Sequence, residues 1–401
     1  MTSLFRPVAA TAALLGAALL LPVTGMGAES PIILSTQCPP GFELDGDNRC
    51  LLRTLYQQYD SPRGAGVGGL KVALPAVRDG FTPQQIDLGR YLFFDPILSA
   101  DASLSCASCH HPDKGFADGR ARSIGVTGEA VGRSAPGLWN VGFMKRLFWD
   151  ARASSLEEQA EGPLYSPQEM GSTPDGVLRR LTQEGDYPRL FSEAFGGDEG
   201  VTLDRLYRAL AAFQSSLVSL NSRYDRYAHG YKEALNAREI EGMNVFRSFV
   251  ARCAECHTPP LFSNQEIAVI GTPEPEGLSF DEGAAVPTGD PSLAGGFKVP
   301  SLRNIELTAP YMHSGRFETL FEAAEFYTKG RGHAVPEGRE LYLHWHIWEP
   351  ELSDRELERL VDFMKALTDE RFKPDAPDRL PSGLAPVHNK NELALQAGET
   401  P

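Results

Sequence analysis

The sequence is short of positive charge and, after its first 23 residues, has no long apolar stretch. Lys and Arg number 38 against 53 Asp and Glu, which gives a net charge of -15. A chain this acidic lacks the basic surface that neutralises phosphates, so we predict no nucleic-acid partner. A basic protein partner remains open, although most acidic surfaces serve solubility alone. No later segment is apolar enough to span a bilayer.

The one long apolar run is typical of an export signal. Arg6 precedes the apolar stretch from Val8 to Val23, and small residues follow at Gly25, Gly27 and Ala28. This order matches a secretory signal peptide, here residues 1–28. A retained anchor is the alternative. We expect cleavage, no retained span and a periplasmic mature protein.

Cysteine is scarce, and its positions are informative. Four of the six cysteines belong to two Cys-x-x-Cys-His motifs, Cys106–His110 and Cys253–His257. The other two, Cys38 and Cys50, flank a Pro/Gly/Asp-rich loop near the expected mature N-terminus. In an oxidising compartment this pair is expected to form a disulfide.

The patterns along the chain predict a mainly helical fold with long loops and little sheet. Thr82 and Pro83 resemble a helix start, and helical periodicity covers 203–220 and 352–367, where Ser353 and Glu356 form a capping box. Gly64 to Gly69 resembles a linker. We therefore expect a signal peptide (1–28), a disulfide-bearing extension with linker (29–80), two haem c domains (81–220 and 221–372) and a loose C-terminal tail (373–401).

An internal repeat supports the two domains. The segment Ala135–Val141 resembles Val299–Ile305. At the same offset, three residues of the first half match three of the second: Arg152, Leu156 and Glu158 match Arg316, Leu320 and Glu322. Each half carries its Cys-x-x-Cys-His motif upstream of these blocks. Two copies of one cytochrome c-like unit explain this pattern.

The two Cys-x-x-Cys-His motifs predict two covalently bound haems. The thiols of such a motif attach to the haem vinyl groups, and the histidine becomes an axial ligand of the iron. The candidates are Cys106, Cys109 and His110, then Cys253, Cys256 and His257. A zinc half-site or a redox dithiol could explain one motif alone, but two motifs without further Cys or His ligands favour haem. His111 is expected to be a bystander.

The first haem is expected to lack a strong sixth ligand. No histidine occurs between His111 and His229, and the loop after the first motif offers only Lys114. An open iron would accept peroxide and would need a neighbouring acid/base group. We predict Glu169 for proton transfer and Gln159 for orienting peroxide. A solvated surface carboxylate is the alternative for Glu169.

The repeat predicts a different environment for the second haem. Tyr327 is as far from Arg316 as Pro163 is from Arg152. A phenol therefore stands where the first half has proline, and Tyr327 becomes a candidate axial ligand opposite His257. A core tyrosine is the plain alternative, and Met312 and His313 are competing ligands.

These residues resemble the bacterial di-haem cytochrome c peroxidase superfamily, and within it the MauG-like branch. The resemblance extends from Phe81 to Thr368 and includes the blocks Leu104–His110, Phe148–Arg152 and Leu307–His313. It implies a peroxide-binding first haem, an electron-transferring second haem and a tryptophan between them, here Trp149.

The resemblance also implies roles for individual residues. The family's distal glutamine, proline and glutamate correspond to Gln159, Pro163 and Glu169. Its inter-haem calcium site corresponds to Asn140, Thr308 and Pro310, which would offer oxygen ligands. Tyr327 in place of methionine is the MauG pattern, which implies a bis-Fe(IV) state that oxidises residues of a partner protein.

One departure and two rival functions remain. Ala251 stands where MauG has a surface tryptophan for hole transfer, so Trp345 and Trp348 are alternative exits. The N-terminal extension is similar to the copper-associated MbnH group, which implies a copper-binding partner whose tryptophan is oxidised. The rivals are a peroxidase that takes electrons from a small cytochrome or cupredoxin, and an electron carrier without catalysis.

Overall fold

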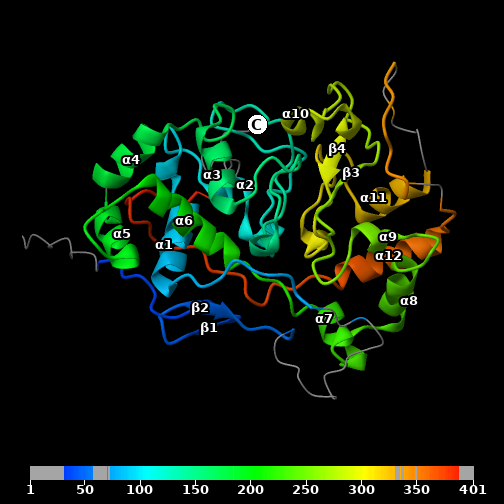
Figure 1. Cartoon of the computed structure of the whole chain (residues 1–401), viewed down its shortest axis with the longest axis horizontal. Helices are drawn as coiled ribbons and strands as arrows, with labels where there is room; N and C mark the ends of the chain where they lie inside the picture. Colours follow the sequence, from blue (N-terminus) through cyan, green and yellow to red (C-terminus); the bar gives the residue numbers. More distant parts are fainter. Residues whose placement is uncertain are drawn as a thin grey trace, which may run out of the picture. The chain divides into compact units, whose positions relative to one another are not determined.

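The computed structural model describes residues 31–56, 70, 73–183, 185–329, 335, 338–347 and 350–387. The chain is mainly helical with little sheet, as predicted (Figure 1). The predicted signal peptide, the Gly64–Gly69 linker, Trp348 and the last 14 residues of the predicted tail lie outside the described residues. None of the helices in the described part has the length and apolar character needed to cross a membrane.

Short helices and strands alternate with long loops. The α-helices are α1 (Pro83–Phe94), α2 (Cys106–Cys109), α3 (Leu156–Tyr165), α4 (Pro174–Gln183), α5 (Tyr187–Phe195), α6 (Leu203–Ser215), α7 (Arg223–Ala228), α8 (Ala237–Phe246), α9 (Cys253–Cys256), α10 (Ala285–Thr288), α11 (Leu320–Phe326) and α12 (Asp354–Lys365). The 3-10 helices are η2 (Pro96–Leu98), η3 (Pro112–Lys114), η4 (Val141–Phe143), η5 (Lys232–Ala234), η6 (Pro291–Leu293), η7 (Ile305–Leu307) and η8 (Tyr327–Lys329). The strands are β1 (Phe42–Leu44), β2 (Cys50–Leu52), β3 (Ile267–Val269) and β4 (Gly296–Lys298).

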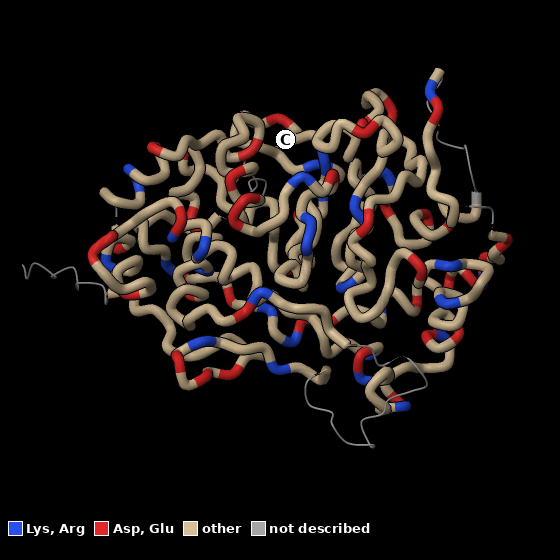
Figure 2. Tube along the Cα trace, in the orientation of Figure 1, with Lys and Arg blue, Asp and Glu red and all other residues tan. Residues whose placement is uncertain are grey.

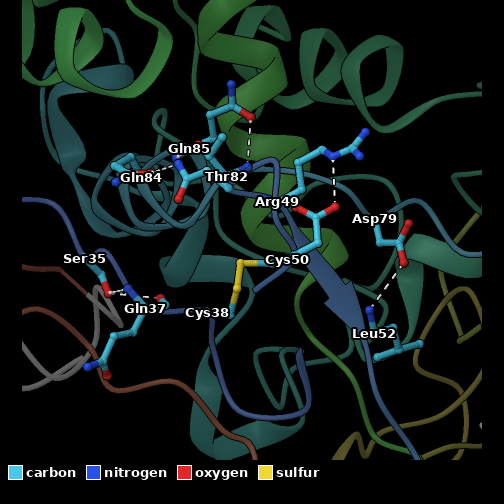
Figure 3. Close-up of a disulfide and its surroundings, with 12 residues drawn as sticks. Ser35, Gln37, Cys38, Arg49, Cys50, Leu52, Asp79, Thr82, Gln84 and Gln85 are labelled. Atoms are coloured by element: carbon cyan, nitrogen blue, oxygen red, sulfur yellow. Dashed lines mark hydrogen bonds and ion pairs between the residues drawn. A yellow bond between two sulfur atoms is a disulfide. The ribbon is translucent and has the colours of Figure 1, made fainter. Parts of the chain in front are cut away.

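Both sheets are antiparallel pairs. Strand β1 pairs with β2, and β3 pairs with β4. The structure joins Cys38 to Cys50 by a disulfide beside the first sheet (Figure 3). The Cys50 N–H donates to the Phe81 carbonyl at 2.8 Å, and Cys50 packs against Phe81 and Ile86. The disulfide closes the loop within the N-terminal extension, and the contacts of Cys50 hold this extension against the start of α1.

Two helix pairs form the cores of the two halves, α1 with α6 and α8 with α12 (Figure 1). Each pair crosses at a glycine. A Cβ at Gly89 would lie 1.9 Å from the Ala209 carbonyl oxygen, and a Cβ at Gly242 would lie 1.8 Å from that of Arg359. Only glycine permits so close an approach of two backbones.

Helix caps act as the sequence predicts. Thr82 caps α1 with Pro83 in the first turn, and Ser353 caps α12 in a capping box with Glu356. Helix α6 is shorter than expected and ends at Ser215. The next residues form a buried extended segment, in which the Leu217 carbonyl accepts a hydrogen bond from the Asn140 N–H. The apolar sequence pattern continues to residue 220 because the residues after the end of the helix are still buried.

The two halves share local backbone features at a constant offset. Asn140 and Asn304 both adopt left-handed conformations, with φ of 62° and 57°, before a 3-10 helix. Ser155 caps α3 as Thr319 caps α11. Helices α1 to α6 fall within 81–220 and α7 to α12 within 221–372. The division into two haem domains stays a prediction that these repeated features support.

The segment 373–387 is not the loose tail that we predicted. Leu380 and Val387 are buried, the Ser382 hydroxyl donates to Asp95 at 2.8 Å, and the Ser105 hydroxyl donates to the Val387 carbonyl at 2.7 Å. The chain therefore returns from α12 to the end of α1 (Figure 1). Its Pro-rich composition excludes a helix but does not prevent packing.

Charges of both signs are interspersed along the trace (Figure 2). Buried pairs are fewer, and one of them stabilises the second half. Arg303 and Asp225 are fully buried and pair at 2.5 Å, while the Tyr56 hydroxyl donates to Asp225 at 2.6 Å. Because each charge is neutralised by the other, the pair is tolerated in the core.

Candidate active site

One cavity of about 670 Å³ is lined by both Cys-x-x-Cys-His motifs. In each half the two cysteines lie on a single helical turn, α2 or α9, and the histidine caps its C-terminus. The His110 N–H donates to the Cys106 carbonyl at 2.9 Å, and the His257 N–H donates to the Cys253 carbonyl at 2.8 Å. This turn directs both thiols and the imidazole toward the same space.

Each motif histidine is oriented by a backbone carbonyl. Nδ1 of His110 lies 2.8 Å from the Phe116 carbonyl, and Nδ1 of His257 lies 3.1 Å from the Phe262 carbonyl. A carbonyl only accepts, so Nδ1 carries the proton and Nε2 retains its lone pair for a metal. Burial also lowers the pKa of both histidines, which keeps them neutral.

The motif thiols are poorly suited to thiolate chemistry. Burial raises the pKa of Cys106, Cys109 and Cys253 to about 12. Without a bound cation these surroundings keep the thiols protonated, which disfavours a reactive dithiol. Neutral thioether bonds to a haem suit the same surroundings.

The predicted distal residues of the first half meet at the cavity. Gln159 and Pro163 lie one turn apart on α3 and both line the cavity, as does Glu169 in the loop after the helix. Burial raises the pKa of the Glu169 carboxyl, and the nearby Arg152 guanidinium opposes this shift. A carboxyl whose pKa is raised toward neutrality is a suitable proton carrier.

In the second half, Ala323 and Tyr327 occupy the positions of Gln159 and Pro163, and both line the cavity. Tyr327 lies at the C-cap of α11. Burial raises its pKa well above the ordinary value, and the nearby Cys256 and Cys253 reinforce this. Without a cation the phenol therefore keeps its proton, and a bound metal ion would favour the phenolate.

Trp149 lies between the two halves. Its indole N–H donates to the Ser134 carbonyl at 2.9 Å, and its ring centroid is 6.5 Å from those of Phe297 and His313. The Lys298 N–H donates to the Trp149 carbonyl at 2.7 Å, while the Ser134 N–H donates to the His313 carbonyl at 2.8 Å. These equivalent bonds hold Trp149 at the junction of the two repeats.

The competing ligands differ in how firmly they are held. His313 is 3% exposed, its Nε2 lies 2.8 Å from Glu274, and its ring stacks on Phe297 with centroids 3.9 Å apart. Nε2 of His313 is thus already paired with Glu274. Met312 lines the cavity, and its carbonyl accepts from the Ser134 hydroxyl.

Our sequence reasoning missed Lys298. Its side chain lines the cavity, and in the described part of the chain its ammonium has no hydrogen-bond or ion-pair partner. Burial lowers its pKa to about 8. A buried cation needs a partner, and a haem carboxylate would supply one. The buried Trp139 indole N–H, at the cavity wall, also lacks a partner among the described residues. The residues present therefore fit haem.

The residues predicted to bind calcium are divided. Thr308 and Pro310 line the cavity, but Asn140 is not part of its lining. The Asn140 amide donates to the Ser219 carbonyl and accepts from the Ser219 N–H, both at 2.9 Å. Its side chain thus holds the segment after α6, and the role of Asn140 in binding calcium stays a prediction.

The surface near the second motif has an apolar character. Ala251 lines the cavity, and the preceding Phe249 is 85% exposed. Trp345, one of the predicted exits, is 64% exposed. Histidines His344 and His346 flank it and line the cavity. The sequence did not indicate that His344 and His346 lie near the second motif, because they follow Cys256 by almost 90 positions.

Comparisons with known proteins agree with this geometry. A family model described as di-haem cytochrome c peroxidase matches residues 83–233. The chain is 36% identical to the methylamine utilization protein MauG of Methylorubrum extorquens, over 71% of this chain and 78% of the relative. It is 37% identical to the cytochrome c551 peroxidase of Nitrosomonas europaea, over 77% of this chain and 86% of the relative.

Solved structures are similar over most of the chain. A MauG-like protein associated with microbial copper homeostasis superposes with a TM-score of 0.68 at 31% identity, covering 79% of this chain and 97% of that protein. The diheme peroxidase BthA from Burkholderia thailandensis gives 0.64 at 26% identity, with 89% and 99% covered.

Proposed function

Since the chain belongs to the di-haem cytochrome c peroxidase family, we propose that it is a MauG-like enzyme that uses hydrogen peroxide to oxidise residues, chiefly tryptophan, of a partner protein. The family's two haems supply the redox chemistry at iron. Peroxide takes up two electrons and two protons and yields two waters. The electrons come from the partner.

The asymmetry of the cavity carries this proposal. Pro163 and Tyr327 occupy equivalent helix positions and both line the cavity. Proline offers no side-chain ligand atom, so a haem held by His110 would keep a position free for peroxide. The Tyr327 phenol would supply an anionic oxygen to the iron of a haem held by His257, which would stabilise its oxidised state.

The residues of the first half have separate tasks. Glu169 accepts a proton from bound peroxide and returns it to the departing oxygen. Gln159 orients peroxide through its side-chain amide. Trp149, held by Ser134, connects the two haem sites. The first haem would be held by Cys106, Cys109 and His110. The second would be held by Cys253, Cys256 and His257, with Tyr327 as a further ligand.

Two features of the surroundings belong to the proposal. The export signal places the enzyme in the periplasm. The partner is a copper-binding protein, on the similarity to the MauG-like protein associated with microbial copper homeostasis. Calcium between the haems remains a prediction. Asn140 would offer a side-chain oxygen, and Thr308 and Pro310 would offer carbonyl oxygens.

The proposal is tested by replacing the phenol. We expect resonance Raman spectra of the oxidised protein to contain phenolate-to-iron charge-transfer bands that Tyr327→Phe removes. The matched control is Tyr311→Phe, because Tyr311 also lines the cavity but its hydroxyl donates to the Ile305 carbonyl at 3.1 Å. Bands that survive in Tyr327→Phe would refute the assigned ligand.

A second function is favoured by the similarity to cytochrome c551 peroxidase. Here the electrons come from a small cytochrome or cupredoxin, and peroxide disposal is the task. Rapid steady-state turnover with a reduced cytochrome, together with no oxidation of any protein residue, would support this function over the first.

A further inference from the structure

Two tyrosines of the first half share a short hydrogen bond, and the proposed function does not use them. The hydroxyl oxygens of Tyr165, at the end of α3, and Tyr207, on α6, lie 2.5 Å apart. Neither residue lines the cavity. We propose that Tyr165 is a redox site, which gives one electron to the first haem after its reaction with peroxide when no partner protein is bound. This inference rests on the proposed function.

The tyrosine pair lies on the helices that form the cavity wall. Tyr165 follows Leu164 in α3, and Tyr207 lies one turn before Leu210 in α6. Leu164 and Leu210 are 1% and 2% exposed, and both line the cavity, as does Pro163. Helices α3 and α6 pack against each other, and this packing brings the two phenols together (Figure 1). The pair is therefore anchored on the two helical segments that wall the peroxide side of the cavity.

The two phenols differ in exposure, and this difference assigns the donor. Tyr207 is 7% exposed, and among the described residues only Tyr165 forms a hydrogen bond with its hydroxyl. A buried hydroxyl needs a partner for its proton, so Tyr207 donates and Tyr165 accepts. Burial raises the pKa of both phenols, so each keeps its proton near neutral pH. Tyr165 is partly exposed, which leaves its own O–H able to reach water.

This arrangement suits the loss of one electron together with one proton. A phenol that loses an electron becomes a strong acid, and Tyr165 can release its proton to water. The Tyr207 O–H then still donates its hydrogen bond to the phenoxyl oxygen and stabilises the radical. Peroxide removes two electrons from the protein, and Tyr165 returns one of them to the first haem site. One oxidising equivalent therefore stays at the haems, and the other is held by the Tyr165 radical.

The test uses the full protein with both haems attached, hydrogen peroxide and no partner protein. Samples are frozen rapidly after mixing and studied by electron paramagnetic resonance. We expect a tyrosyl radical signal that narrows when the protein contains ring-deuterated tyrosine, and Tyr165→Phe should abolish it. Tyr91→Phe is the matched control and should keep the signal, because Tyr91 is another partly exposed tyrosine of the first half, on α1.

A second variant separates the redox role from a purely structural one. Tyr207→Phe keeps the oxidised phenol and removes only its hydrogen bond, so the radical should persist with a shifted g value and decay faster. A hydrogen bond that serves packing alone would give no radical in either protein. Haem absorption and circular dichroism show whether each variant keeps its fold.

Stopped-flow absorption follows the reaction with peroxide separately. Tyr165→Phe should react with peroxide at the wild-type rate, since Tyr165 acts only after that step. An unchanged radical signal in Tyr165→Phe would overturn the inference, as would the absence of a tyrosyl radical in wild-type protein that has reacted with peroxide. Wild-type protein that does not react with peroxide at all would refute the proposed function and the inference together.

Discussion

The two halves of the molecule share one backbone plan and differ at the few side chains that face the cavity. Both contain a helix pair crossing at glycine, a left-handed asparagine and a histidine held by a phenylalanine carbonyl. At equivalent positions of the repeat, however, the first half has Pro163 and the second half has Tyr327, and both residues line the cavity. The shared backbone gives the two halves similar frameworks, and in the proposed function the difference between Pro163 and Tyr327 leaves one haem site open and closes the other.

Further differences concentrate where the repeats meet. Trp149 corresponds to His313, and Ser134 corresponds to Lys298, and all four residues line the cavity. Across the junction the Lys298 N–H donates to the Trp149 carbonyl, and the Ser134 N–H donates to the His313 carbonyl, so the two backbone hydrogen bonds are equivalent. Since the backbone bonds are kept, the side chains at these positions can differ between the halves without changing how the repeats meet.

The largest expected effect comes from removing one haem at a time. Cys106→Ser/Cys109→Ser should abolish the reaction with peroxide and leave one bound haem. The mirror variant Cys253→Ser/Cys256→Ser should keep the fast reaction of the first haem but lose oxidation of the partner. Haem stoichiometry and stopped-flow absorption measure both. If the Cys106→Ser/Cys109→Ser variant still reacted with peroxide, the first haem could not be the peroxide site.

The next effect concerns the proton carrier, which has no counterpart among the described residues of the second half. Glu169→Gln should slow the reaction with peroxide by about 10²–10⁴-fold, because the amide cannot accept the proton. Glu161→Gln, an exposed residue of α3, is the matched control and should change nothing. The rate constants come from stopped-flow mixing. Similar rates in both variants would exclude Glu169 from proton transfer.

The third effect tests a stabilising contact that belongs to the second half. Arg303, which replaces the equivalent Trp139, pairs with Asp225 in full burial. Arg303→Met leaves the Asp225 carboxylate unpaired and should lower the free energy of unfolding by about 3–5 kcal/mol. Urea unfolding measures this, with the exposed Arg316→Met as control. An equal, small loss in both variants would contradict the importance of the buried pair.

The smallest expected effect is a shift in pH dependence. Burial raises the pKa of Glu169 and Arg152 lowers it, so the proton-accepting carboxylate forms as the pH rises through the raised pKa. Arg152→Gln removes the opposing charge and should move the acid limb of the rate profile to higher pH by about one unit. The exposed Arg146→Gln should leave the limb in place. A shift to lower pH would reverse the proposed electrostatics.

The sequence by itself determined the features that depend on neighbouring residues. Thr82 and Ser353 cap their helices through bonds to residues three positions ahead, so the local pattern sufficed. The Cys-x-x-Cys-His spacing fits a single turn, and the repeat aligned Pro163 with Tyr327. The mainly helical fold with two equivalent halves was predictable for the same reason.

Only the tertiary structure decided which distant groups meet. His344 and His346 reach Cys256 across almost 90 positions, the Asn140 amide is used by Ser219, and the segment after residue 373 returns to Asp95. Such contacts depend on how loops pack and on which buried polar groups need partners. These requirements are satisfied across the whole fold, and no local pattern records them.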